Sequence, residues 1–184
     1  MKMFTLLLLI IFALSAFLYA DEAQTAAQPR EEKLDDMMMA GVVIMDPANS
    51  EDYSKAWEKF FQVSYLIQNT IGEEFYGVTY YTEDYSPTEG VGQAYMVCTQ
   101  VKSPNDLPEG VSIRKIPAAN YLVFEHQGSM EKVGETYNYI YNVFLADSDY
   151  TVLYRDTLER YDHRFMADPD EAVFEIWIPV QGKQ

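Results

Sequence analysis

The chain has 184 residues, of which 48% are hydrophobic and 23% are charged, which excludes a disordered or collagen-like protein. Its 13 Lys and Arg against 29 Asp and Glu give a formal charge of −16. That charge argues against a nucleic-acid-binding face and against docking on anionic lipid. Aromatic residues reach 15%, including 15 tyrosines. Such a composition suits a cationic or flat apolar ligand, or simply an aromatic core under an acidic, solubilising surface.

Residues 1–20 have the pattern of a secretory signal peptide. Lys2 provides the positive start, the run from Phe4 to Leu18 is uncharged and apolar, and the small residue Ala20 precedes Asp21. We therefore expect cleavage before Asp21, export to the periplasm or the medium, and no stable membrane association afterwards. The alternative is an uncleaved anchor helix. It is supported by the large Leu18 at the −3 position, but the run is short for a membrane span.

Residues 21–36 (DEAQTAAQPREEKLDD) are polar and lack apolar periodicity, which predicts a flexible linker. This stretch is also too short for a helix-turn-helix DNA reader. The single domain is expected to occupy residues 37–184. Cys98 is the single cysteine, so no intramolecular disulfide can form. It lies in the apolar run AYMVCTQV, which predicts a buried structural thiol rather than a nucleophile.

Two units with the same order of elements follow one another along the chain. The first has a strand over 37–45, a helix capped by Asn49 or Ser50 that continues to Gly72, and strands over 76–82 and 91–101. A loop with two prolines and the segment 111–117 lead to the second unit. It has a strand over 120–128, a helix over 129–147 capped by Ser129, and closing strands over 150–154, 157–162 and 172–180.

This order predicts an α+β fold with duplicated β-α-β-β units, an antiparallel sheet and two helices. We expect each helix to cover one face of the sheet. The opposite faces of the two halves would then line a ligand cleft between them.

Alternation along the closing strands selects candidate site residues. Thr157, Glu159 and Tyr161 share one face of their strand. On the last strand the apolar residues Phe174, Ile176, Ile178 and Val180 share the face expected under the helices, which leaves Glu175 and Trp177 to the cleft or to solvent. If the two strands pair antiparallel, Glu159 and Glu175 could face the same space.

A carboxylate inside an aromatic box is costly to ionise, and a bound cation restores the charge balance. Each well-placed ring adds roughly 0.5–2 kcal/mol of cation–π attraction. Tyr80, Tyr95 and Trp57 are further candidates for the lining. The alternative is that Glu159 is a surface carboxylate paired with Arg155 or Arg160, and that Trp57 and Trp177 are core residues.

Other chemistries find little support in the sequence. His126 and His163 do not stand at metal-ligand spacing with any cysteine or histidine, and the acidic stretch 168–171 lacks a calcium-loop pattern. The sequence contains no glycine-rich phosphate loop and no G-x-S-x-G elbow. We therefore expect no metal and no cofactor.

Several segments together resemble the GyrI-like effector-binding domain of AraC-type and multidrug-responsive regulators. They are MMMAGVVIM, KAWEKFF, EEFYGVTYYTEDYS, DLPEGVSIRKIPAANYLVFEHQGSMEKVGETYNYIY, LERYD and FEIWIPV, within residues 37–181. The resemblance implies the doubled unit described above and a cleft that takes small molecules, often lipophilic cations. It also implies that Glu159 is the ligand-receiving glutamate, and it matches Glu175 to the acidic position of the last strand. The signal peptide and the missing DNA-binding domain depart from this pattern.

We therefore expect an exported small-molecule-binding protein that captures lipophilic or cationic ligands at Glu159, Glu175, Tyr161, Trp177, Tyr80, Tyr95 and Trp57, for sensing or sequestration. No nucleic-acid partner is expected. One alternative is a hydrolase of strained electrophilic toxins, since some stand-alone family members resemble such enzymes. Glu159 or Glu175 would then act as acid or base. The other alternative is a protein-interaction module.

Overall fold

The structure is a computed structural model that describes residues 28–165 and 172–182. The predicted signal peptide 1–20, the first part of the predicted linker and the acidic stretch 168–171 lie outside the described residues. Within the described ranges, no helix is both long and apolar enough to cross a membrane.

The described residues contain nine strands that pair antiparallel throughout, in the order β1-β6-β9-β8-β3-β4-β2-β5, with β7 beside β9. Their bounds are β1 Arg30–Leu34, β2 Met37–Met45, β3 Phe75–Ser86, β4 Val91–Gln100, β5 Ser112–Ile116, β6 Ala119–Gln127, β7 Tyr150–Val152, β8 Thr157–Tyr161 and β9 Val173–Gly182. The predicted α+β fold with an antiparallel sheet is confirmed.

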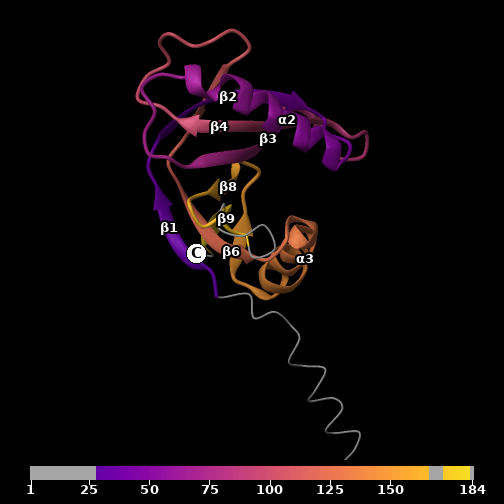
Figure 1. Ribbon diagram of the computed structural model, residues 1–184. Coiled ribbons are helices and arrows are strands. Elements are labelled where there is room, and N and C mark those ends of the chain that lie inside the picture. The colour runs from indigo at the N-terminus through magenta and orange to yellow at the C-terminus, as the bar shows by residue number, and fades with distance from the viewer. Residues whose placement is uncertain (1–27, 166–171, 183–184) are drawn as a thin grey trace, which may run out of the picture.

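The sheet consists of two halves with matching order, which meet at β3 and β8 (Figure 1). The first half has the order β2-β4-β3 and the second has the order β6-β9-β8. Each half also receives an edge strand from the other half of the chain. β1 precedes β2 but pairs with β6, and β5 precedes β6 but pairs with β2. This exchange ties the halves into one sheet.

β1 corrects the predicted linker, because residues 30–34 form an ordered edge strand. Arg30 pairs with Val123 and Leu34 with Ala119 along β6. All five residues of this strand, REEKL, are exposed or half-buried at the sheet edge, which is compatible with their polar side chains. An edge strand of this kind lacks the apolar alternation that signals a strand in the sequence.

The first helix, α2, spans Ser50–Val63 and ends earlier than predicted. Asn49 caps it, and its Oδ1 accepts from the backbone N–H of Glu51 at 2.9 Å. After Val63 the chain makes a 3₁₀ turn, η1, over Ser64–Leu66 and then leaves the helix. Asn69 takes the left-handed backbone conformation with φ 60°. The chain turns back there, and the backbone N–H of Ile71 donates to the Gln100 carbonyl of β4 at 2.8 Å.

The second helical segment is irregular along its length. It consists of the 3₁₀ turn η2 Met130–Lys132, the α-helix α3 Val133–Asn138, the π-helical η3 Tyr139–Phe144 and the 3₁₀ turn η4 Leu145–Asp147. The predicted cap is wrong in detail, because the Ser129 side chain makes no capping hydrogen bond. Instead the Ser129 carbonyl lies 3.3 Å from Nε2 of the buried His126 on β6, which anchors the start of the segment.

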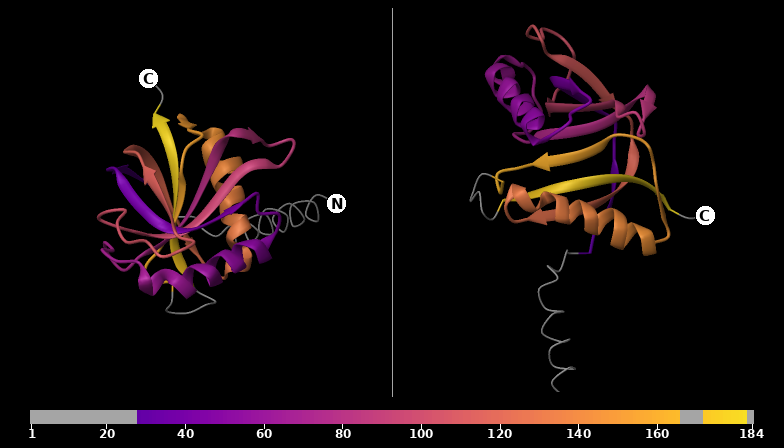
Figure 2. Two further views of the ribbon diagram at one scale, coloured as in Figure 1. Left: turned by 90° about the horizontal axis from the view of Figure 1, so that it is seen from above. Right: turned by 90° about the vertical axis from the view of Figure 1, so that its right-hand side faces the viewer.

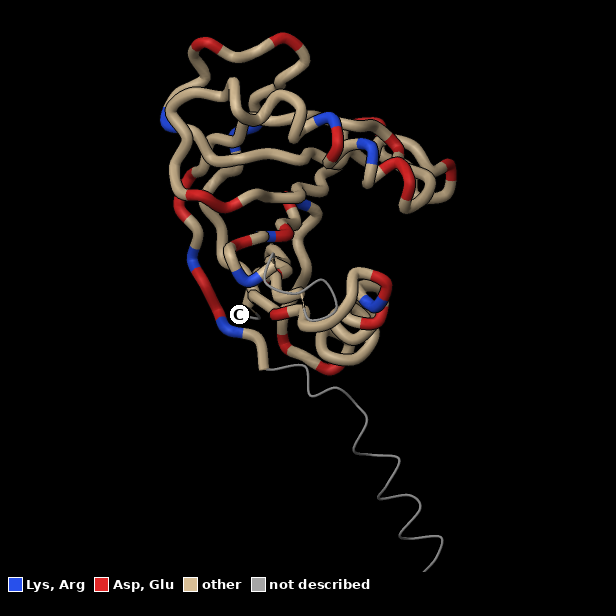
Figure 3. The backbone as a smooth tube through the Cα atoms, viewed as in Figure 1, with Lys and Arg blue, Asp and Glu red and all other residues tan. Residues whose placement is uncertain are grey.

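Both helices lie on the same face of the sheet, one against each half (Figures 1 and 2). The opposite face curls around a shared core in which Val78 and Met96 of the first half pack with Tyr121 and Trp177 of the second. The expectation that the cleft between the halves lies on the faces opposite the helices is corrected, because this core packs there and leaves a smaller hollow of about 470 Å³ lined in part by Tyr76, Leu158 and Trp177. A larger cavity lies on the helix-covered side and has lining residues from both α2 and α3. The backbone tube of Figure 3 shows these two helices well separated on that side of the sheet.

Candidate functional site

A cavity of about 750 Å³ lies between α2 and α3 above the strands where the two halves meet. We call it the Glu159 cavity. It is lined by Pro47, Ala48, Asn49, Ser50, Tyr53, Ser54, Trp57, Thr79, Tyr81, Gln93, Tyr95, Met130, Val133, Tyr137, Tyr141, Thr157, Glu159 and Tyr161. Its volume falls within the range of sites that hold drug-sized molecules.

The Glu159 carboxylate accepts hydrogen bonds from three tyrosine hydroxyls. Tyr137 of α3 donates to Oε1 at 2.7 Å. Tyr95 of β4 and Tyr161 of β8 donate to Oε2 at 3.0 Å and 2.9 Å. The three donors come from both halves of the fold, so the tertiary structure assembles this site around Glu159.

These tyrosines stay protonated at neutral pH. Burial raises the pKa of Tyr95, Tyr137 and Tyr161 well above the usual value, and the adjacent charge of Glu159 raises it further. Each hydroxyl therefore remains a neutral donor. Among the described residues, no Lys, Arg or His forms an ion pair with Glu159, since Arg160 pairs with Glu74 and Glu175 instead. The carboxylate thus has hydrogen-bond partners but no cationic partner in this part of the chain.

Aromatic rings surround this carboxylate on the α2 side. Trp57 Nε1 donates to the Tyr95 hydroxyl at 3.2 Å, and its ring lies edge-to-face with Tyr161 at a centroid distance of 4.9 Å. Tyr53, one turn earlier on α2, lies edge-to-face with Tyr95 at 4.7 Å. Together these rings and the carboxylate form a box open to the cavity.

Gly77 provides the room for this arrangement. It lies directly opposite Glu159 in the β3–β8 pair. A Cβ atom built at Gly77 would come within 2.3 Å of the Tyr95 hydroxyl and 2.6 Å of Glu159 Oε2. Glycine inside a strand often marks such a close approach. Only a residue without a side chain leaves both polar groups in place.

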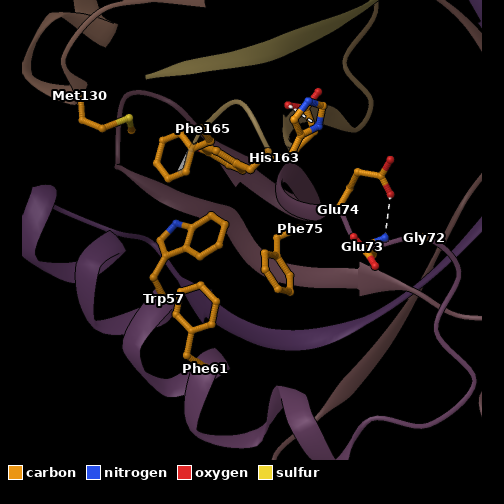
Figure 4. A pocket seen from close by; sticks show the side chains of 11 residues that line it. Trp57, Phe61, Gly72, Glu73, Glu74, Phe75, Met130, His163 and Phe165 are labelled. Atoms are coloured by element: carbon orange, nitrogen blue, oxygen red, sulfur yellow. Dashed lines mark hydrogen bonds and ion pairs between the residues drawn. The ribbon is translucent and has the colours of Figure 1, made fainter. Parts of the chain in front are cut away.

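A second cavity of about 630 Å³ shares lining residues with the first, and Figure 4 shows its side chains. We call it the aromatic chamber. It is lined by Trp57, Phe61, Gly72, Glu73, Glu74, Phe75, Met130, Tyr161, Asp162, His163 and Phe165. Trp57 and Phe61 project from α2 toward Phe75 and Phe165, and Trp57, Met130 and Tyr161 also line the Glu159 cavity.

Glu175 and Trp177 lie away from the Glu159 cavity, which corrects the expectation that Glu159 and Glu175 share a space. The two strands pair antiparallel as predicted, but their register places Glu159 opposite Ile176 and Arg160 opposite Glu175. Glu159 is therefore on the helix-covered face and Glu175 on the other. Glu175 is buried and accepts from Arg30 at 2.8 Å, Arg160 at 3.1 Å and Trp177 Nε1 at 3.0 Å.

Tyr80 is also outside the Glu159 cavity. The guanidinium of Arg114 lies 3.4 Å from the centre of its ring, and the ring packs against the core on the other face of the sheet. Of the seven predicted residues, Glu159, Tyr161, Tyr95 and Trp57 come together at the cavity, whereas Glu175, Trp177 and Tyr80 do not.

Sequence reasoning missed Tyr137, Tyr53 and Gly77. Tyr137 and Tyr141 stand four residues apart on the second helical segment and both reach the cavity, whereas Tyr139 packs against the core of the second half. Helical spacing could have separated these tyrosines. The glycine in the strand YGVTYYT was the available signal for Gly77.

The Cys98 thiol and the acidic, histidine and cysteine side chains were the other candidates for chemistry. Cys98 is fully buried, as predicted, and its pKa is raised by burial. Across the described residues, no cluster of three or more His, Cys, Asp or Glu side chains could hold a metal ion.

Comparison with known proteins finds a transcriptional regulator and several solved structures that this chain resembles. It is 31% identical over 88 residues to the transcriptional regulator BrlR of Pseudomonas aeruginosa, a match that covers 47% of this chain and 32% of that regulator. The fold is similar to that of SAV2435 bound to tetraphenylphosphonium, with a TM-score of 0.66 and 18% identity over 85% of this chain and 95% of that one.

The C-terminal domain of EcmrR is similar as well, with a TM-score of 0.65 and 16% identity, covering 84% of this chain and 98% of that domain. At these identities the two structures show a shared fold.

The model of the GyrI-like small molecule binding domain matches residues 27–181. Because this match covers most of the chain, the chain belongs to the GyrI-like small molecule binding domain family.

Proposed function

We propose that the Glu159 cavity binds lipophilic organic cations. The observation that carries the proposal is a carboxylate that three neutral tyrosines hydrogen-bond and that no Lys, Arg or His of the described residues neutralises. A cation entering this box meets an unbalanced negative charge at close range, on a half-buried carboxylate. It also meets the rings of Tyr53, Trp57 and Tyr95, whose faces attract cations and repel anions.

The proposal agrees with the ligand in a protein of the same fold, since SAV2435 is bound to tetraphenylphosphonium. It also agrees with the net charge of −16, because an acidic protein attracts cations and slows the approach of anions. The three tyrosine hydroxyls supply hydrogen bonds to the Glu159 carboxylate in the empty protein.

Calorimetry with two ions of equal shape and opposite charge tests this function. The wild type should bind tetraphenylphosphonium and reject tetraphenylborate. Glu159→Gln keeps the side-chain volume and removes the charge, so the affinity for tetraphenylphosphonium should fall roughly tenfold to a few hundredfold, or about 1.4–3.4 kcal/mol. Tetraphenylborate should bind no more weakly to this variant than to the wild type.

A matched control is Glu125→Gln, because Glu125 is an exposed carboxylate on β6, outside both cavities. It should leave both affinities unchanged. Equal loss of tetraphenylphosphonium binding in both variants would mean that long-range charge, rather than Glu159, attracts the cation, and would refute the proposal. Incubation with a strained electrophile tests the hydrolase alternative, because its complete recovery without a hydrolysed product would indicate binding alone.

We also propose that this capture takes place outside the cytoplasm, for sequestration or sensing and without nucleic-acid contact. The support is the pattern of residues 1–20, with Lys2, a long apolar run and Ala20 before Asp21. Mass spectrometry of protein purified from fractionated cells should find a mature chain that starts at Asp21. An intact Met1 in the membrane fraction would contradict it. A sequence-specific mobility shift of DNA would contradict the absence of nucleic-acid contact.

A further inference from the structure

The Glu159 cavity and the aromatic chamber meet at a partition made by Trp57, Tyr161 and Met130, which line both. The polar atoms of Trp57 and Tyr161 make their hydrogen bonds with residues of the Glu159 cavity. Tyr161 donates its hydroxyl to Glu159, and Trp57 donates its Nε1–H to Tyr95. The ring of Tyr161 packs edge-to-face against Phe165 in the chamber, with centroids 4.8 Å apart. Each of these two side chains is thus polar toward one space and apolar toward the other.

The aromatic chamber exposes apolar surface in a concave site. Phe61 is 50% exposed and Met130 is 42% exposed, although both are large apolar side chains. In Figure 4, Trp57 lies across the chamber from Phe165. Phe61 packs edge-to-face against Phe75 with ring centroids 5.4 Å apart. Apolar surface gathered in a hollow gains free energy when an apolar group covers it.

The acidic residues of the chamber are less suited to a cation than Glu159 is. Glu74 pairs with Arg160 at 2.7 Å, and Asp162 pairs with Arg164 at 2.9 Å. Figure 4 places Glu73, Glu74 and His163 at the end of the chamber away from Met130, and hence away from the partition. A cationic group is therefore better matched in the Glu159 cavity, and an apolar group in the chamber.

We propose that the two cavities act as one bipartite site for amphiphilic cations. The cationic head lies against Glu159, and a flexible apolar tail passes the partition and covers the chamber wall formed by Phe61, Phe75 and Phe165. This inference rests on the proposed function, because it takes Glu159 as the site of the head. It adds the class of ligand, which is a quaternary ammonium or similar cation with a long alkyl tail.

A series of n-alkyltrimethylammonium ions, from tetramethyl to decyl and below their micelle concentrations, tests the inference by calorimetry. For the wild type, affinity should rise with tail length, by at most about fourfold for each methylene that becomes buried. Phe61→Ala should weaken the decyl ion about tenfold and leave tetramethylammonium unchanged. Met130→Ala, at a second exposed position, should also reduce the dependence on tail length.

Tyr65→Ala is the matched control for Phe61→Ala. Tyr65 lies four residues further along, is 75% exposed and lines neither cavity. This variant should bind the whole series as the wild type does. Glu159→Gln should weaken every member of the series by the same factor, without changing the dependence on tail length.

The outcomes separate the two proposals. If tetraphenylphosphonium binding depends on Glu159 but the wild type binds short and long tails equally, the bipartite site is refuted and the proposed function stands. The same conclusion follows if Phe61→Ala and Tyr65→Ala give equal affinities for the decyl ion. If affinity rises with tail length but Glu159→Gln changes nothing, the head lies elsewhere, and both proposals are refuted.

Discussion

Gly77 on β3 lies directly across from Glu159 on β8, and the missing side chain at Gly77 leaves the space that the Glu159 carboxylate occupies. The Tyr95 hydroxyl uses the same space and donates to Glu159 Oε2. The position of the one carboxylate in the aromatic box is thus controlled from the neighbouring strand. A site that depends on charge at a given point is sensitive to displacements of about an ångström.

Gly77→Ala should therefore weaken cation binding without touching the charge of Glu159. The added methyl group cannot fit without moving Tyr95 or Glu159, since its contacts would be 2.3 Å and 2.6 Å. We expect a loss of about 1–3 kcal/mol in the free energy of unfolding and about a tenfold weaker binding of tetraphenylphosphonium. Urea denaturation and calorimetry measure the two effects.

Gly134→Ala is the control, because a Cβ at Gly134 in α3 meets nothing within 4 Å. It should leave cation binding intact and stabilise the helix slightly, by about 0.5–1 kcal/mol. If Gly77→Ala binds the cation as the wild type does, then the geometry around Glu159 is less restrictive than we infer.

Tyr137→Phe should destabilise the empty protein. It removes the 2.7 Å hydrogen bond to Glu159 Oε1 and keeps the aromatic ring. Hydrogen bonds to a charged group contribute about 1.5–3 kcal/mol, and we expect the lower part of this range because Tyr95 and Tyr161 still donate to the carboxylate. Tyr139→Phe, on the same helical segment but outside the cavity, should change the free energy of unfolding by less than about 0.5 kcal/mol. Similar losses in both variants would argue against a special role for Tyr137.

Glu175 should contribute to stability at neutral pH and lose this contribution in acid. Burial of this carboxyl raises its pKa, but hydrogen bonds from Trp177, Arg160 and Arg30 outweigh burial, so the pKa lies below the ordinary value of 4.5. A carboxyl whose pKa is lower in the folded state stabilises the protein above the unfolded-state value, near 4.5. The stabilisation is lost as the pH falls through the lower folded-state value.

Glu175→Gln should therefore lower the free energy of unfolding by about 1–3 kcal/mol at pH 7, less than for a fully buried pair because its arginine partners are partly exposed. The difference between this variant and the wild type should shrink progressively below pH 4.5. Urea unfolding at a series of pH values measures it. Cation binding should be unaffected, because Glu175 lies on the other face of the sheet. A difference that is constant with pH would mean that the ion pairs are not its source.

Cys98 should be inert toward thiol reagents in the folded protein. Its side chain is fully buried, and burial raises its pKa, so thiolate is scarce and inaccessible. We expect no reaction with a disulfide reagent in native buffer over an hour and complete reaction of one thiol in 6 M guanidinium. Rapid labelling of the native protein would show that the β4 region opens readily.

Much of the fold follows from local patterns in the sequence. The apolar run 37–45, the capped helix after Asn49 and the alternating segment before Gln127 are all visible without a structure, because each signal arises from residues close together in the chain. Two features could not be predicted from local patterns, because each depends on pairing with distant residues. The edge strand Arg30–Leu34 pairs with β6. The chain after α2 turns back to bond to Gln100 of β4.

The sequence by itself determined which residues of the closing strands share a face, since side chains alternate along any strand. It therefore grouped Glu159 with Tyr161, and Glu175 with Trp177. Only the tertiary structure decided which of these faces meets the cavity. The register of β8 against β9 places Glu159 beside Ile176 and under the helices, and a shift of one residue would have reversed this assignment. Tyr95, Tyr137 and Gly77 join Glu159 for the same reason, because strand pairing and helix packing bring together residues far apart in sequence.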